Sequence, residues 1–272
     1  MRSVLLLLSL LVAGGASAHE FWIEPVDARP SADGMVVADL VNGQDFDGTR
    51  LPYIPARTEA LTLTFDGETT DLAPRIGDRP AVNVPALGDG LHVAAYVSTW
   101  SPLTYDDFAV FRRFAAHKDL LGGEEATVAA HLARGFSEAD GPTESYARYS
   151  KALIGVGSAA GSDVELGLET ELVALDNPYT DDVSDGVRVA LTYKGEPRGD
   201  EQVEIYDRPP EGEVEVSTVR TDAEGVAVVP VEPGHVYMLD AVVLREPEAA
   251  PGIESGAMWE SLWANLVFAV PE

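Results

Sequence analysis

The 272-residue sequence contains no cysteine and few basic residues. Without cysteine the chain has no disulfide, no thiolate metal site, no cysteine nucleophile and no cysteine for lipid attachment. Lys and Arg total 18 against 46 Asp and Glu, which gives a formal net charge of −28. So acidic a surface repels phosphate backbones and anionic membranes, which excludes a general nucleic-acid-binding protein. The same charge favours solubility and attracts cations.

The sequence also lacks the familiar catalytic motifs. It has no G-x-S-x-G elbow, no P-loop and no G-x-G-x-x-G run before a predicted helix. Its longest apolar run lies at the N-terminus and is far shorter than the ~20 residues that span a bilayer. We therefore expect a protein that is not an enzyme and whose mature chain has no membrane span.

Residues 1–18, MRSVLLLLSLLVAGGASA, have the three parts of a secretory signal peptide. Arg2 supplies the positive start, an apolar run follows, and the final Ala-Ser-Ala has the small–x–small form of a cleavage site. We predict export to the periplasm and cleavage after Ala18, which makes His19 the first residue of the mature protein. An N-terminal His offers its α-amine and its ring Nδ1 to one metal ion as a chelate. Such nitrogen donors suit nickel, cobalt, copper or zinc.

The mature chain is predicted to be mainly β. Period-two alternation of apolar and polar residues predicts strands, among others over 61–65, 91–99, 186–193 and 235–244. Turn signals separate the strands at intervals typical of a β-sandwich. The predicted architecture is two β-sandwich modules, residues 19–157 and 158–272, with the boundary in the GVGSAAG segment.

A helical insertion is predicted in the first module, at about 104–153. Apolar residues at helical spacing predict a helix over 106–121, and EEATVAAHLAR predicts another over 124–134. A third helix is expected over 141–153, where Glu144 and Arg148 have the i,i+4 spacing of a helical ion pair.

Five histidines are the candidate nitrogen ligands: His19, His92, His117, His131 and His235. No two of them have H-x-H, H-x-x-x-H or H-E-x-x-H spacing, so a metal site must be assembled from distant segments. We take His19, His117 and His92 as the metal ligands. His131 is expected to be exposed, and His235 to lie at a turn.

Other polar and aromatic residues receive structural interpretations. Glu20 and Glu24 are expected to keep an edge strand soluble, with a carboxylate ligand as the alternative role. Trp259 and Trp263 are expected in core or inter-module packing. The segment 148–153, RYSKAL, is expected to bridge helix and sandwich, with anion binding as the alternative.

Several long segments resemble one protein family. They are AHEFWIEP, DFDGTRLPYIPAR, RIGDRPA, FAAHKDL, ESYARYSKALI, LVALDNPY, PGHVYMLDAVVLREP and MWESLWANLVFAV. The chain is similar along these segments to exported bacterial proteins of a domain-of-unknown-function family described as nickel-uptake substrate-specific proteins. The resemblance implies immunoglobulin-like and carboxypeptidase-regulatory-like sandwich modules, and YKGEPRGDEQVEIYD is similar to the latter. It also implies a periplasmic protein that handles nickel or cobalt, with a metal-uptake permease as partner.

The resulting hypothesis is a periplasmic transition-metal-binding protein that supports metal uptake, binding nickel or cobalt, with copper or zinc as alternatives. Two other functions stay open. The first is a copper oxidoreductase in which an N-terminal His and a second His hold copper as a histidine brace, with a coordination position open. The second is a metal-independent carbohydrate-binding or adhesion sandwich, in which His19 is incidental.

Overall fold

The computed structural model describes residues 19–139 and 141–272, so the predicted signal peptide lies outside the described residues. Over the described ranges the protein is mainly β, as the sequence predicts, with strands arranged in sheets and few helices. In these same ranges, none of the helices combines the length and the apolar character needed to cross a bilayer.

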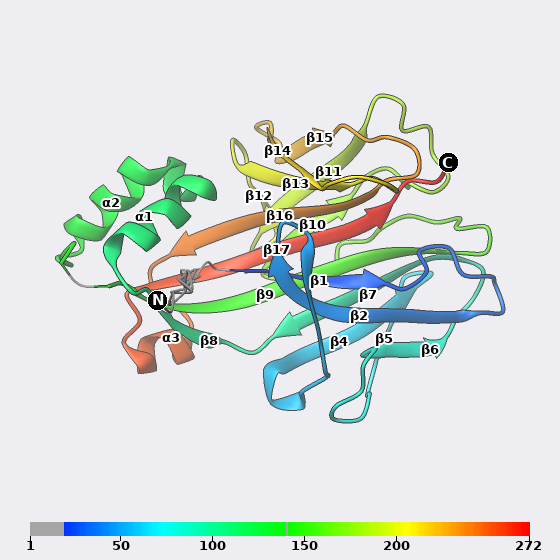
Figure 1. Cartoon of the computed structure of the whole chain (residues 1–272), viewed down its shortest axis with the longest axis horizontal. Helices are drawn as coiled ribbons and strands as arrows, with labels where there is room; N and C mark the ends of the chain where they lie inside the picture. The colour runs from blue at the N-terminus through cyan, green and yellow to red at the C-terminus, as the bar shows by residue number, and fades with distance from the viewer. Residues whose placement is uncertain (1–18, 140) are drawn as a thin grey trace, which may run out of the picture.

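A large sheet forms the middle layer of the molecule (Figure 1). Its strands are β4 (Thr58–Phe65), β5 (Glu68–Asp71), β7 (Gly90–Ser98), β8 (Ser101–Thr104), β9 (Thr143–Val156), β13 (Gln202–Arg208), β14 (Glu215–Arg220), β16 (Val236–Arg245) and β17 (Trp259–Ala269). They follow the order β14-β13-β16-β17-β9-β7-β4-β5, with β8 also paired to β9. β17 and β9 run parallel. This sheet joins strands from both predicted modules in one hydrogen-bonded layer.

A smaller sheet packs on each face of the large one. The first contains β1 (Glu20–Pro25), β2 (Met35–Gln44), β3 (Asp47–Leu51) and β6 (Val82–Pro85). The second contains β10 (Thr170–Ala174), β11 (Val187–Tyr193), β12 (Glu196–Pro197) and β15 (Val226–Val229). Successive side chains of a strand point to opposite faces, so the central strands supply both cores. In β9, for example, Leu153 joins the core beneath the second sheet, while Ile154 joins the core beneath the first.

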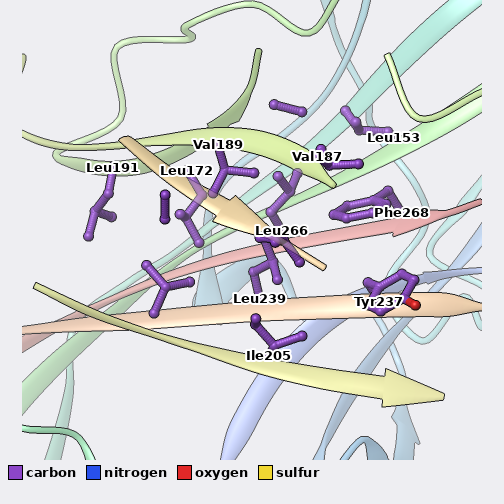
Figure 2. Packing of buried hydrophobic residues seen from close by; sticks show 14 of the residues in the cluster. Leu153, Leu172, Val187, Val189, Leu191, Ile205, Tyr237, Leu239, Leu266 and Phe268 are labelled. Atoms are coloured by element: carbon purple, nitrogen blue, oxygen red, sulfur yellow. The ribbon is translucent and has the colours of Figure 1, made fainter. Parts of the chain in front are cut away.

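Figure 2 shows the core between the second small sheet and the central sheet. Leu172, Val187 and Val189 of the small sheet pack toward Leu239, Leu266 and Phe268 of the central strands. On β11 the buried residues Val187, Val189 and Leu191 follow the expected period-two pattern, whereas β10 and β16 are buried at almost every position. The β-sandwich packing predicted from the sequence is therefore present on this face.

The helical insertion lies at one end of the molecule (Figure 1). It consists of α1 (Phe108–His117), the short 3₁₀ turn η2 (Leu120–Gly122) and α2 (Glu124–Ala133); η1 (Pro55–Arg57) and α3 (Ala250–Ser255) lie elsewhere. Asp107 caps the N-terminus of α1: its carboxylate accepts the Val110 N–H at 2.8 Å. Phe114 stacks on Trp263 with ring centroids 5.5 Å apart. The expected packing role of Trp263 is thereby confirmed.

The third predicted helix, over 141–153, is wrong: residues 143–153 lie in β9, so the helices of the insertion span 108–133. Residues four apart share a side both in a helix and in a strand, so the Glu144–Arg148 spacing could not separate the two. Tertiary context decides between them. β9 pairs with β17 on one side and with β7 on the other, and it is buried along almost its whole length.

Candidate metal-binding site

A row of polar side chains crosses the central sheet beside the start of β1 and the end of α1. The strand registers place side by side Glu204 of β13, Asp240 of β16, Asn265 of β17 and Ser150 of β9. Two residues further along the same strands, the same face carries Tyr206, Met238, Val267 and Ala152, which belong to an apolar core. The sheet thus has a buried polar row beside an apolar one.

Lys118, the residue that follows α1, places its ammonium over this row. Its Nζ lies 3.0 Å from Glu20 Oε1 and 3.0 Å from Asp240 Oδ2, and it also donates to Glu204 Oε2. Tyr206 Oη is 3.3 Å from the same Nζ and donates to Glu204 Oε2 at 2.7 Å. The lysine side chain is only 3% exposed. One ammonium therefore faces three buried carboxylates, with His117 and the buried Arg148 as the other basic groups close to them.

His117 closes this cluster on the solvent side. Its Nε2 lies 2.9 Å from Glu204 Oε1, and its side chain is 57% exposed. Glu20, His117 and Glu204 can each present one ligand atom, and these three atoms lie within 4.8 Å of one another. Atoms bound to one ion are at most about 4.4 Å apart, because metal–ligand bonds measure about 2.0–2.2 Å. The three groups thus need only a small inward shift to share one ion.

Burial and charge pairing set the protonation states of the cluster. Burial alone would raise the pKa of Glu204, but hydrogen bonds from His117 and Lys118 and their charges outweigh it and lower that pKa to about 2. Burial also opposes the charge on Lys118, yet attraction from Asp240 and the other two carboxylates raises the pKa of the lysine. The hydrogen bond with Glu204 raises the pKa of His117. At neutral pH, Glu204 is therefore ionised and Lys118 is protonated.

Several buried polar atoms around the cluster lack a hydrogen-bond partner within the described residues. They are Glu20 Oε2, Asp240 Oδ1, Arg148 Nη1 and both amide atoms of Asn265. Burial raises the pKa of Asp240 to about 6, although Lys118 acts against this rise. Unpaired buried polar atoms are costly, and in native proteins they are explained by strain, by a functional role, or by a bound water or ion. An ion at Glu20 could use the free Oε2 and leave the contact of Oε1 with Lys118 intact.

His19 directly precedes this cluster in the chain. It is exposed, and its neighbour Glu20 is 3% exposed. Consecutive Cα atoms lie about 3.8 Å apart, so the α-amine and the ring of His19 are attached only one residue away from Glu20 of the cluster. The structure thus brings His117, one predicted ligand, to the residue that follows His19, another.

The third predicted ligand, His92, lies away from the cluster, and its contacts are those of a residue that stabilises the fold. It is fully buried in β7 and stacks on Phe65, with ring centroids 4.6 Å apart. Its Nε2 accepts the Leu87 N–H at 3.0 Å, and its Nδ1 donates to the Gly90 carbonyl oxygen at 3.0 Å. Both ring nitrogens are thereby engaged with backbone. Burial lowers the pKa of His92, which agrees with a neutral ring that holds the turn before β7.

The two remaining histidines also have partners outside the cluster. His131 was expected to be exposed, but it is fully buried, because α2 packs this face on β17. Its Nδ1 accepts the indole N–H of Trp259 at 3.1 Å, and its ring lies 4.9 Å from that of Phe108. His235 lies beside a turn, as expected, with its Nδ1 2.7 Å from Asp207 Oδ1.

Sequence reasoning missed most of the cluster. Glu20, expected mainly as a solubilising edge residue, is buried under the end of α1. Lys118, Glu204 and Asp240 were not singled out at all. One signal was available: a single ionisable residue inside an otherwise apolar strand, as Asp240 is in VYMLDAVVL, since such residues are rarely fully buried without a partner.

Comparison with known proteins gives one positive result. No curated protein matches the chain. The family of a domain of unknown function, DUF4198, matches residues 16–245, a range that includes Glu20, His117, Glu204 and Asp240. This match covers most of the sequence, and the chain therefore belongs to the DUF4198 family.

Proposed function

We propose that the mature protein binds one transition-metal ion beside the start of β1 and supports its uptake or handling in the periplasm. The observation that carries this proposal is the convergence of one ligand atom each from Glu20, His117 and Glu204 within 4.8 Å. His19, as the terminal residue after cleavage, adds its α-amine and its ring Nδ1. The ion is the cargo, bound reversibly, and no covalent bond of a substrate is made or broken.

The donor set favours a transition metal, such as nickel, cobalt, copper or zinc, as the cargo. Two imidazoles and an amine supply nitrogen, and one carboxylate oxygen each comes from Glu20 and Glu204. Imidazole-rich sites suit nickel, cobalt, copper and zinc, whereas oxygen-only sites suit magnesium and calcium. The net charge of −28 on the whole chain attracts cations of every kind, so the selection must come from these local donors.

The position of His117 suits a protein that takes up and releases its ion. Its side chain is 57% exposed, whereas that of Glu204 is 2% exposed. An ion between them contacts buried, fixed oxygen on one side and solvent on the other. Such a half-open site lets a permease or another acceptor reach the ion without unfolding the protein.

Calorimetric titration of nickel, cobalt, copper and zinc tests this proposal. The protein is purified from the periplasm, and its first residue is checked by mass spectrometry to be His19. We expect one ion per chain, with at least tenfold weaker binding after His117→Ala and after addition of one Gly before His19. His235→Ala, which removes a histidine outside the cluster, should bind as the wild type does. Equal binding by all four forms, or none by the wild type, contradicts the proposal.

A second candidate function, copper-dependent oxidation, draws on the same half-open geometry. An exposed His117 next to a terminal His19 leaves a coordination position facing solvent, which is what a catalytic metal needs. The copper-loaded protein would then consume peroxide in the presence of a reductant, and His117→Ala would abolish that activity. A protein that binds copper tightly but consumes no peroxide favours metal handling instead.

A further inference from the structure

Lys118 occupies the position at which three carboxylates converge. Its Nζ contacts Glu20 Oε1 and Asp240 Oδ2 at 3.0 Å each, and it also donates to Glu204 Oε2. The backbone N–H of Lys118 donates to the Phe114 carbonyl oxygen at 3.0 Å, so the end of α1 holds the lysine in place. The ammonium thus has the surroundings of a bound cation, with oxygen atoms from three separate strands.

Without its ammonium, this position would offer oxygen donors only. Glu20, Glu204 and Asp240 supply carboxylates, and Tyr206 supplies a phenol oxygen 3.3 Å from the lysine Nζ. Calcium and manganese prefer carboxylates and other oxygen ligands, and their affinity rises with the number of carboxylates. With the ammonium present, one oxygen of each carboxylate is taken. The other oxygen of Glu204 faces His117, and Oε2 of Glu20 has no hydrogen-bond partner in the described part of the chain.

We propose that Lys118 determines the metal specificity of the site. Its ammonium substitutes for a cation among the three carboxylates, which keeps calcium, magnesium and manganese out of the oxygen-rich inner position. Only the outer position beside His117 remains, and its nitrogen donors select transition metals. This proposal rests on the proposed function, because it concerns the same site.

The other buried lysine, Lys151, provides a matched comparison. Its Nζ lies 2.9 Å from Asp163 Oδ1 and 2.9 Å from Glu171 Oε1, and its side chain is 1% exposed. Here, however, the carboxylates also accept backbone N–H groups, such as those of Leu166 and Ala174, at 2.9 Å each. Removal of Lys151 therefore exposes no comparable set of free oxygens to a cation.

The test compares Lys118→Met with Lys151→Met and the wild type in titrations with calcium, manganese and nickel. We expect wild type and Lys151→Met to show no binding at this site with millimolar calcium or manganese. Lys118→Met should bind both ions at least tenfold more tightly than wild type. If the wild type binds no nickel, the proposed function fails. If it binds nickel but folded Lys118→Met gains neither calcium nor manganese binding, the proposed function stands and the role of Lys118 is overturned.

Loss of the ammonium leaves three carboxylates buried, so folding of the variant needs its own control. The double variant Lys118→Met, Asp240→Asn keeps Glu20 and Glu204 but removes one negative charge. We expect calcium or manganese to raise the melting temperature of the single or the double variant, and not that of Lys151→Met. If neither ion raises the melting temperature of either Lys118 variant, Lys118 does not set the specificity.

Discussion

The two buried lysines, Lys118 and Lys151, lie on opposite faces of the central sheet and have different surroundings. Lys151 sits with Asp163 and Glu171 in a closed cluster, where backbone N–H groups complete the bonding of both carboxylates. Lys118 sits among three carboxylates, next to the half-exposed His117. Oxygen atoms of Glu20 and Asp240 lack partners there, over the described residues.

This difference separates a structural use of buried charge from the functional use that we propose. A buried ion pair whose atoms are all hydrogen-bonded fixes the packing of the strands around it, and nothing further can bind. A buried cluster with spare acceptors beside an exposed imidazole keeps the capacity to bind a cation. The Lys151 cluster thus belongs to the fold, and the Lys118 cluster belongs to the candidate site.

The largest expected effect concerns the closed cluster. Lys151→Met leaves Asp163 and Glu171 buried without their counter-charge, which should lower the free energy of unfolding by about 3–5 kcal/mol. Urea denaturation followed by circular dichroism measures it. Lys194→Met is the control, because Lys194 is 47% exposed and its solvent-screened pair with Glu248 should contribute little to stability. A loss below about 1 kcal/mol in Lys151→Met would mean that the closed cluster does not support the fold.

Exchange of one carboxylate in each cluster sharpens the comparison. Glu204→Gln and Glu171→Gln each remove a buried negative charge next to a lysine, so both should lower stability. Only Glu204→Gln should also weaken nickel binding, by tenfold or more, which corresponds to about 1.4 kcal/mol. Calorimetry on both variants distinguishes the clusters. Equal nickel affinities in the two variants would remove Glu204 from the site.

His92 and His117 show the same contrast between a closed and an open environment, and the pH dependence of stability tests the closed one. His92 is closed, with both ring nitrogens bonded to backbone, and burial lowers its pKa. A histidine with a depressed folded-state pKa stabilises the protein above its unfolded value of about 6.5, and this contribution is lost as pH falls toward the folded value. We therefore expect the free energy of unfolding to fall between pH 7 and pH 5, with His92 as one contributor to that fall.

The variant His92→Gln should lose that part of the pH dependence while its nickel affinity at pH 7 stays unchanged. Denaturant titrations at several pH values, together with one calorimetric titration, supply both readings. A weakened nickel affinity in folded His92→Gln would return His92 to the set of ligands and break the division between closed and open histidines.

The smallest expected effect concerns Asn265, in the middle of the polar row. Both of its amide atoms lack a hydrogen-bond partner among the described residues, at 1% exposure. Replacement by Leu, of similar size, removes two unpaired polar atoms and should raise the free energy of unfolding by about 1 kcal/mol. A loss of stability in thermal melts would show instead that the amide of Asn265 forms hydrogen bonds in solution, and that the polar row binds water or another partner there.

Local patterns were enough to predict much of the fold. The strand over 91–99 and the helix over 124–134 have periodicities that one segment reveals by itself, and both are present. The helix expected over 141–153 failed because its evidence, a spacing of four, is common to helices and strands. That segment becomes β9 through pairing with β7 and β17, which a local reading could not foresee.

The candidate site was predictable only in part, for a related reason. His117 could be selected because imidazole is a common metal ligand, whatever the local sequence pattern. Glu204 and Asp240 become neighbours only through the register of β13 on β16. Lys118 joins them because α1 packs on Trp263, far along the chain. These contacts join residues far apart in the sequence, so local spacing cannot predict them.

Anomalous diffraction from a crystal of the nickel-loaded mature protein, recorded at the nickel edge, tests the central claim most directly. The account predicts one strong peak per chain, at bonding distance from His117 and His19, with Glu20 or Glu204 as an oxygen ligand. It also predicts that the Lys118 ammonium stays among the carboxylates. A peak away from His117, or no peak at full nickel occupancy in solution, would contradict the account.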